Sequence, residues 1–329
     1  MRAAAQSYIA PIVAGLVALV TLIGLIGPAI QSPSPHDVPV GLAGPAPAVD
    51  QISSAFAQNA PGVFDFTTYS SEADARAAID DRSVDGALVI GAGGSKLIVA
   101  GAAGDTVTGI ITAAFTNVFQ KQGQPLTVET VHPFASGDPH GLILFFVVLA
   151  ILVSTLITQI LLSLRPGVAL STRMLVVLLF AVVSAPVAMG LATWIVGDYG
   201  SGLWAATALG ALTSAAVGAV VAGMAALLGR LGVGLAALIA VLFDLVASGG
   251  PIGSAVLPDV YRWFAPAMPA GQVYSGMRGA LYFDGAGVGT PVLVLAAWLV
   301  GGVVLLAAGA LVRRAPAQPS LVPAHGTHG

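Results

Sequence analysis

Residues 142–164 read LILFFVVLAILVSTLITQILLSL, a stretch that contains no charged side chain. A helix needs about 20 consecutive apolar residues to cross the hydrocarbon core of a bilayer, because each residue advances it by only about 1.5 Å. The stretch is long enough to cross once. It therefore predicts a membrane-spanning helix.

Five further stretches have the same character, and they cover residues 8–30, 174–197, 203–228, 231–249 and 291–312. The apolar run that begins at residue 203 is too long for one span, so we place a tight turn at Gly229-Arg230-Leu231-Gly232. The first stretch could instead be a signal peptide. Its apolar run is longer than the usual length of about 7–15 residues and no small-x-small cleavage site follows, so we expect residues 1–30 to form an N-terminal anchor.

The composition supports an integral membrane protein. Of the 329 residues, 57% are hydrophobic and 8% are charged, and the mean hydropathy is +0.92. A soluble domain carries about 25% charged residues. Residues 31–140 hold 11 acidic and 4 basic side chains, a net charge of −7 and more than half of all the charges. We expect this segment to form the water-facing domain, and residues 141–315 to form a five-helix transmembrane domain.

The placement of arginine predicts the orientation. If the N-terminus is cytoplasmic, the arginines that flank the expected spans all lie inside, at positions 2, 165, 173, 230, 313 and 314. The short outer loop at 198–202 then carries no positive charge, as the positive-inside rule favours. We expect a multi-pass protein of the plasma membrane with both termini in the cytoplasm, including a disordered tail at residues 316–329.

The segment 31–140 alternates between strand and helix patterns. Period-two runs predict strands at 38–42, 63–69, 84–90, 96–100 and 126–132, and helical periodicity predicts helices at 49–59, 71–82 and 105–122. Ser71 and Asp74 form a helix-start signal. The alternation predicts a small extracytoplasmic α/β domain. The glycine-rich stretch 91–96 lacks the spacing of a phosphate-binding loop and is expected to be a turn between strands.

Several function classes have no support in the sequence. The chain has no cysteine, which excludes disulfides and thiolate metal sites. It has no basic tract for nucleic acid, and no GxSxG or HExxH motif for hydrolysis. We expect no enzyme activity, no cofactor and no metal site. The scattered His36, Asp37, His132, Asp138 and His140 are expected to be ordinary linker residues.

Asp244 is the only ionisable residue inside an expected span. A carboxylate at the centre of a membrane helix costs about 2.5–3.5 kcal/mol, so it is either functional or paired. We keep both readings open: a substrate-pathway or proton-linked role, and a structural role, either at the outer membrane interface or paired with an arginine, for which Arg278 is the most plausible partner. Gln272, Tyr274 and Arg278 lie in the segment 251–284. Its prolines and aromatic residues predict short broken helices at the outer membrane interface, with a plain outer loop as the alternative.

Small residues recur every four positions in the span 203–228, and the stripe includes Gly210, Ser214 and Gly218. Small side chains on one face allow another helix to approach closely. The partner helix belongs either to the same bundle or to a second copy of the chain.

The end of the fifth span carries a pattern of a known family. Ser248-Gly249-Gly250-Pro251, Leu257-Pro258, Pro266, Met268-Pro269, Gly276 and Arg278 resemble the pattern SGG-x-P…LP…P-x-LP…G-x-R of the ABC type-2 exporter permeases, in particular their phage-infection-protein-like branch. One span, a large outer domain and five further spans are similar to that family's layout. The outer domain also matches its A-x-x-A-I segment at residues 75–79.

The resemblance implies a membrane permease subunit of an exporter for amphipathic or lipid-like molecules. It further implies a homodimer and a separate ATPase subunit. The loop with Arg165 and Arg173 would then be the site of ATPase coupling. Independently of the resemblance, a hairpin that dips back into the membrane would bring Gln272, Tyr274 and Arg278 to the depth of Asp244, and we expect these four residues to form the substrate pathway and outer gate. Two other functions remain open: an ion-coupled transporter that uses Asp244, and a non-transporting membrane protein whose outer domain binds a partner.

The predicted orientation can be tested directly, because the chain has no cysteine of its own. A single cysteine introduced at Ser320 should resist an impermeant thiol reagent in intact cells and react after the membrane is opened. Labelling of intact cells at this position would contradict the cytoplasmic C-terminus.

Overall fold

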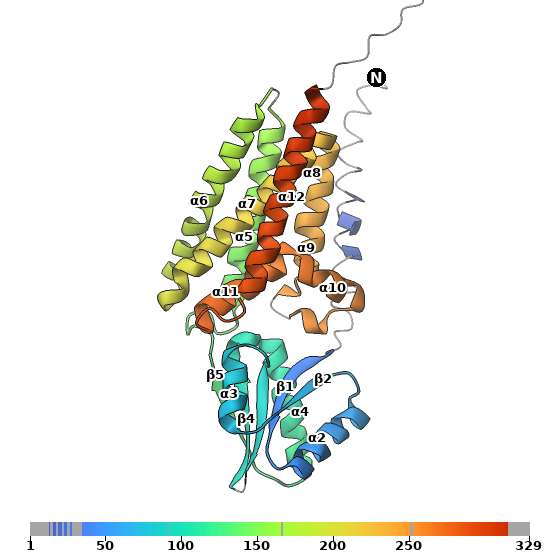
Figure 1. The fold of residues 1–329 in the computed structure, drawn as a ribbon, viewed down its shortest axis with the longest axis vertical. Helices are drawn as coiled ribbons and strands as arrows, with labels where there is room; N and C mark the ends of the chain where they lie inside the picture. Colours follow the sequence, from blue (N-terminus) through green and yellow to red (C-terminus); the bar gives the residue numbers. More distant parts are fainter. Residues whose placement is uncertain are drawn as a thin grey trace, which may run out of the picture.

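The computed structural model describes residues 35–91, 93–165, 167–250 and 253–314, together with isolated positions between 13 and 27. Within these ranges a bundle of helices carries an α/β unit at one end (Figure 1). The expected first span at 8–30 lies almost entirely outside the described residues, and the expected tail at 316–329 lies wholly outside them.

The α/β unit contains a five-stranded sheet. Its strands are β1 (Val38–Ala43), β2 (Phe64–Tyr69), β3 (Gly86–Gly91), β4 (Gly94–Ala100) and β5 (Leu126–Val131), in the order β2-β1-β3-β4-β5. Only the β3–β4 pair is antiparallel, and its register places Gly91 opposite Gly94. The stretch 91–96 therefore belongs to a hairpin, as expected, and not to a phosphate loop.

Helices cover both faces of this sheet. They are α2 (Ala46–Asn59), α3 (Glu72–Asp80) and α4 (Asp105–Lys121), the last preceded by a single turn, η1 (Gly101–Ala103). Successive residues of a strand point to opposite faces, so Leu97 and Val99 pack under α2 and α4, whereas Ile98 and Ala100 pack under α3. The predicted helix start is present, because the Ser71 hydroxyl accepts a hydrogen bond from Asp74 N.

Four helices are long and apolar enough to cross a membrane: α5 (Leu142–Ser163), α6 (Leu170–Val196), α7 (Leu203–Leu228, preceded by η2, Gly200–Gly202) and α12 (Gly289–Arg314). The chain is mostly helical, and these four helices have the character of a membrane protein. They correspond in position to the second, third, fourth and sixth expected spans.

The fifth expected span has a different form. It is a shorter helical run made of α8 (Arg230–Ala237), a π-helical stretch η3 (Leu238–Phe243) and α9 (Asp244–Ala247). The expected turn before it is present at Gly229, whose φ of 61° ends α7. Broken helices follow it, as predicted: η5 (Ser254–Val256), α10 (Asp259–Phe264), η6 (Ala265–Ala267) and α11 (Pro269–Tyr282).

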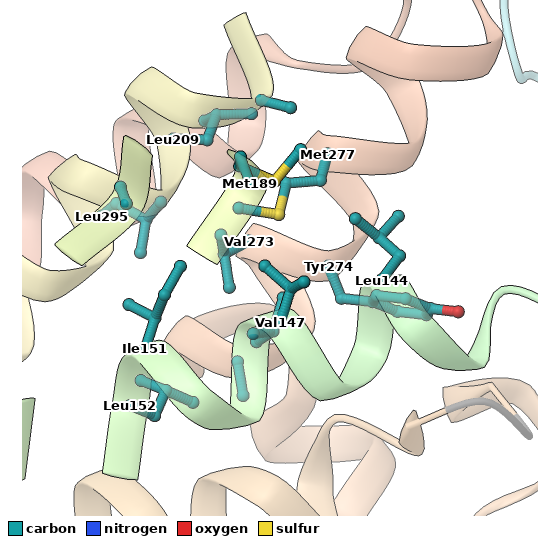
Figure 2. Close-up of a cluster of buried hydrophobic side chains, with 14 of the residues drawn as sticks. Leu144, Val147, Ile151, Leu152, Met189, Leu209, Val273, Tyr274, Met277 and Leu295 are labelled. Atoms are coloured by element: carbon teal, nitrogen blue, oxygen red, sulfur yellow. The ribbon is translucent and has the colours of Figure 1, made fainter. Parts of the chain in front are cut away.

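One face of α11 belongs to the core of the helical bundle (Figure 2). Its Val273, Tyr274 and Met277 are at most 5% exposed. They pack in one cluster with side chains of α5, α6, α7 and α12, among them Leu144, Ile151, Met189, Leu209 and Leu295. The segment between the last two long helices is therefore not a plain loop, because one of its helices is built into the bundle.

The small-residue stripe of α7 is enclosed within this chain. A Cβ on Gly210 would lie 3.0 Å from Ile151 and 3.1 Å from Met277, and one on Gly218 would lie 3.2 Å from Val177. The Ser214 hydroxyl is 2.9 Å from that of Thr155 on α5. The stripe thus lets α5, α6 and α11 approach α7 closely, and it serves contacts within one bundle.

A matched pair of glycines on α12 tests this close packing. A Cβ on Gly302 would lie 2.5 Å from Val220 N and 2.6 Å from Ala219 C on α7, whereas one on Gly301 meets nothing within 4 Å. Gly302→Ala should lower stability by about 1–3 kcal/mol, because the two backbones must separate. Gly301→Ala should be neutral or gain up to about 1 kcal/mol from helix propensity.

Thermal unfolding of the two variants in the same detergent measures this difference. Equal melting temperatures would contradict the backbone contact between α7 and α12.

Candidate functional site

A cavity of about 390 Å³ lies where the α/β unit meets the broken helices. We call it the junction cleft. Its lining comes from three parts of the chain: the residues before β1 with His36 and Asp37, the turn after α9, and the helices α10 and α11. Segments far apart in the sequence thus share one polar hollow at the end of the bundle.

Three of the four predicted pathway residues line the junction cleft: Gln272, Tyr274 and Arg278, all on α11. The Gln272 side-chain amide donates a hydrogen bond to Pro266 O at 2.9 Å. The guanidinium of Arg278 lies 4.9 Å from the centre of the Tyr274 ring, within the range of a cation–π contact. The Tyr274 hydroxyl donates to Gly141 O at 3.2 Å, which ties α11 to the residue before α5.

Asp244, the fourth predicted residue, does not line the cleft. It is 0% exposed, and its two carboxylate oxygens accept from Ala270 N at 2.8 and 3.0 Å. Ala270 lies in the first turn of α11, where backbone N–H groups have no partner within the helix and the helix dipole favours negative charge. Asp244 therefore caps α11 from a neighbouring helical run.

The prediction that Arg278 pairs with Asp244 is wrong. Arg278 lies eight residues beyond Ala270, about 12 Å further along α11 at 1.5 Å per residue. Its Nη1 instead donates to Ala102 O, at 3.2 Å, and to Ala103 O. Both carbonyls belong to the α/β unit. The arginine expected to point toward the bundle thus binds the neighbouring unit.

A second arginine crosses the same junction in the opposite direction. Arg82, which follows α3, donates from Nη1 to Ser275 O and from Nη2 to the Ser275 hydroxyl, both at 3.0 Å. Nη1 also lies 3.3 Å from Ala286 O, and the guanidinium lies 5.1 Å from the centre of the Phe283 ring. We call this set of contacts the Arg82 socket. Its walls are formed by the end of α11 and the turn that follows.

The socket needs a glycine at position 279. A Cβ there would lie 2.8 Å from Arg82 Nη1 and 2.4 Å from Ala286 O. Arg82 itself has a φ of 65°, in the left-handed region that costs a non-glycine residue energy. The contacts of its side chain compensate for this local strain.

Asp85 is the carboxylate that faces the two arginines. Burial raises the pKa of Asp85, and the positive charges of Arg278 and Arg82 oppose that rise. Burial and the like charge of Arg278 lower the pKa of Arg82 to about 10. The guanidinium of Arg82 still carries its proton at neutral pH, so both arginines at the junction are cations.

The scattered histidines and aspartates have structural roles at the same junction. Asp37 pairs with Arg262 at 2.6 Å, and His132 lies 2.7 Å from Asp80. Asp138 is 3% exposed and accepts from Ile143 N and Leu144 N, so it caps the start of α5. His140 contacts Asp105. The described residues contain no cluster of His, Asp or Glu side chains that could hold a metal ion.

The predicted coupling loop joins α5 to α6. Arg165 is exposed there, and Arg173 Nη1 donates to the Ser163 hydroxyl at 3.0 Å. This loop lies at the end of the bundle away from the α/β unit (Figure 1). The two candidate regions, loop and cleft, are therefore at opposite ends of the helices.

Sequence reasoning missed Arg82, Asp85 and Ser275. Arg82 follows two aspartates in a polar stretch, which is typical of an exposed charged turn, and Ser275 lies among small residues. Their importance comes from a contact across 193 positions of sequence, and no local pattern marks it.

Arg82→Ala tests the socket, with Arg76→Ala as the matched control. Arg82→Ala removes hydrogen bonds from a charged donor and should cost about 1.5–3 kcal/mol. Arg76 makes only surface ion pairs with Glu72 and Glu129, and its loss should cost no more than about 1 kcal/mol.

Hydrogen exchange separates a local effect from general unfolding. Amides of residues 279–288 should exchange faster in Arg82→Ala and at the wild-type rate in Arg76→Ala. Equal exchange in all three proteins would contradict the socket.

Comparison with protein-family models, with curated proteins and with solved structures finds no match for this chain.

Proposed function

We propose that the chain is the membrane permease subunit of an exporter for amphipathic molecules, and that the junction cleft is the outer end of its path. In this proposal the protein works as a homodimer in the plasma membrane. The α/β unit faces the outside, and a separate ATPase subunit binds the opposite end of the bundle.

The observation that carries the proposal is the composition of the cleft and of the helix α10 at its edge. The cleft itself is lined by polar groups such as Gln272 and Arg278. On α10, whose Arg262 lines the cleft, Trp263 is 79% exposed and Val260 is 62% exposed. A polar hollow on a helix that also carries exposed apolar side chains suits a molecule with a polar head and an apolar body.

The position of α11 gives the cleft a link to the helices. The same helix carries Arg278 in the cleft and Met277 in the core of the bundle, where Met277 is 0% exposed. A change in the packing of the spans would therefore move the cleft lining. Such a connection is what alternating exposure of a path to the two sides of a membrane requires.

The sequence contains no nucleotide-binding motif, so the proposal assigns ATP hydrolysis to another subunit. The exposed Arg165, in the loop between α5 and α6, is the contact proposed for it. Affinity purification of the tagged full-length chain from native membranes should recover an ATPase. Arg165→Glu should reduce the recovery several-fold, because it reverses the charge offered to the partner.

Arg230→Glu is the matched control, since Arg230 is also exposed and lies at the start of a different helix, α8. It should leave the recovery unchanged. If the wild-type chain recovers no ATPase, the ATP-driven exporter is wrong. If Arg165→Glu and Arg230→Glu behave alike, the assignment of the coupling loop is wrong.

Ion coupling through Asp244 is the second candidate, and its buried carboxylate is the observation in its favour. The two bonds from Ala270 N give Asp244 a structural role that accounts for its burial. Asp244→Asn separates the two functions. Loss of transport with an unchanged melting temperature would favour ion coupling, whereas a lower melting temperature would favour the cap.

A further inference from the structure

Arg278 borders the junction cleft without an acidic partner at ion-pair distance among the described residues. The other arginine of the lining, Arg262, pairs with Asp37 at 2.6 Å and with Asp259 at 3.4 Å. The charge of Arg278 is met within the described residues by the carbonyl oxygens of Ala102 and Ala103.

Arg278 also has donors to spare. A guanidinium has five N–H groups, and Nη1 of Arg278 uses its own on the carbonyls of Ala102 and Ala103. Within the described residues Nη2 donates no hydrogen bond, and Nε is buried without an acceptor. An unsatisfied donor on a partly buried cation costs free energy, which an anionic acceptor would recover.

We infer that the junction cleft binds the anionic head group of an amphipathic molecule, a phosphate or a carboxylate, and that Arg278 is its principal contact. This inference rests on the proposed function, an exporter of amphipathic molecules, and it names the chemical class of the exported substrate. The head group accepts from Nη2 of Arg278, and the apolar part lies outside the polar cleft, against exposed apolar side chains such as that of Trp263 on α10.

The charge of the surrounding unit makes this site selective. Residues 31–140 have a net charge of −7, so the α/β unit as a whole repels anions. Binding of an anion here depends on Arg278, whose Nη1 is held by the carbonyls of Ala102 and Ala103 while Nη2 is left to donate. A lysine would keep the positive charge but could not bind the carbonyls and the ligand with two separately placed nitrogens, so it should serve less well.

The test uses the purified full-length chain in a nonionic detergent with two soluble short-chain lipids. Dihexanoyl phosphatidic acid has an anionic head, and dihexanoyl phosphatidylcholine has a zwitterionic head on the same chains. The wild-type protein should bind the first at least about tenfold more tightly, as measured by titration calorimetry. This comparison needs no variant, so it does not depend on the folding of a mutant.

The variants locate the site. Arg278→Gln should weaken binding of the phosphatidic acid at least about tenfold, and Arg278→Lys should weaken it less. Arg230→Gln, which removes an exposed arginine far from the cleft, should leave binding unchanged. Inorganic phosphate is the third probe: if it binds as tightly as the lipid, the anion site stands and its ligand is free phosphate.

Equal affinity for the two lipids would overturn the inference, as would binding that neither Arg278 variant weakens. The outcome is separate from that of the proposed function. An anion site in a chain that recovers no ATPase would leave the inference standing and the exporter wrong. If an ATPase is recovered but the chain shows no preference for the anionic lipid, the exporter stands and the inference about the anionic head group is wrong.

Discussion

Two guanidinium groups hold the α/β unit to the helical bundle through hydrogen bonds that run in opposite directions. Arg82 reaches from the α/β unit to Ser275 on α11, and Arg278 reaches from α11 to the carbonyls of Ala102 and Ala103. Each arginine belongs to one of the two parts and donates its hydrogen bonds to the other. The α/β unit and the bundle are therefore linked in both directions. The cleft exists only while this junction is closed, since its walls come from both sides.

The constraint continues along α11. Asp244 holds the first turn of this helix, and Arg82 holds its middle at Ser275 and the turn that follows it at Ala286. Between Ala270 and Ala286, Val273 and Met277 are buried in the bundle. A helix fixed at both ends and packed along one face has little freedom of its own. The residues that it offers to the cleft are therefore held in place by the fold itself, an arrangement that would lower the entropic cost of binding for the proposed ligand.

The apolar runs predicted the four long helices because a continuous run of hydrophobic residues directly indicates a helix whose surroundings are apolar. Strand alternation worked for the same reason, as Leu97 and Ile98 face two different cores. The junction could not be predicted in this way. The pairing of Asp244 with Arg278 seemed reasonable from charge alone, but the rise along α11 separates the first turn from Arg278. Arg82 has no local signal, because its partners are distant in sequence.

Gly210, Gln272, Tyr274 and Arg278 were predicted from residue type and spacing, and the reasons were physical ones: close approach, polarity near an interface and charge near hydrocarbon. The structure shows which groups these four residues contact. Gly210 contacts Ile151 and Met277, and Arg278 contacts a carbonyl pair in the other unit. Residue type thus singled out these positions, and tertiary packing decided which groups they contact.

The Arg82 socket also limits which substitutions related sequences can accept at its positions. Positions 82 and 279 are almost two hundred residues apart, yet a methyl group at Gly279 would lie within 2.8 Å of the Arg82 guanidinium. A lineage could accept a larger residue at 279 only together with a shorter one at 82, and the loss of Arg82 would leave Asp85 facing a single cation. These three positions should therefore change together among related sequences, as a correlated set that joins two otherwise separate parts of the chain.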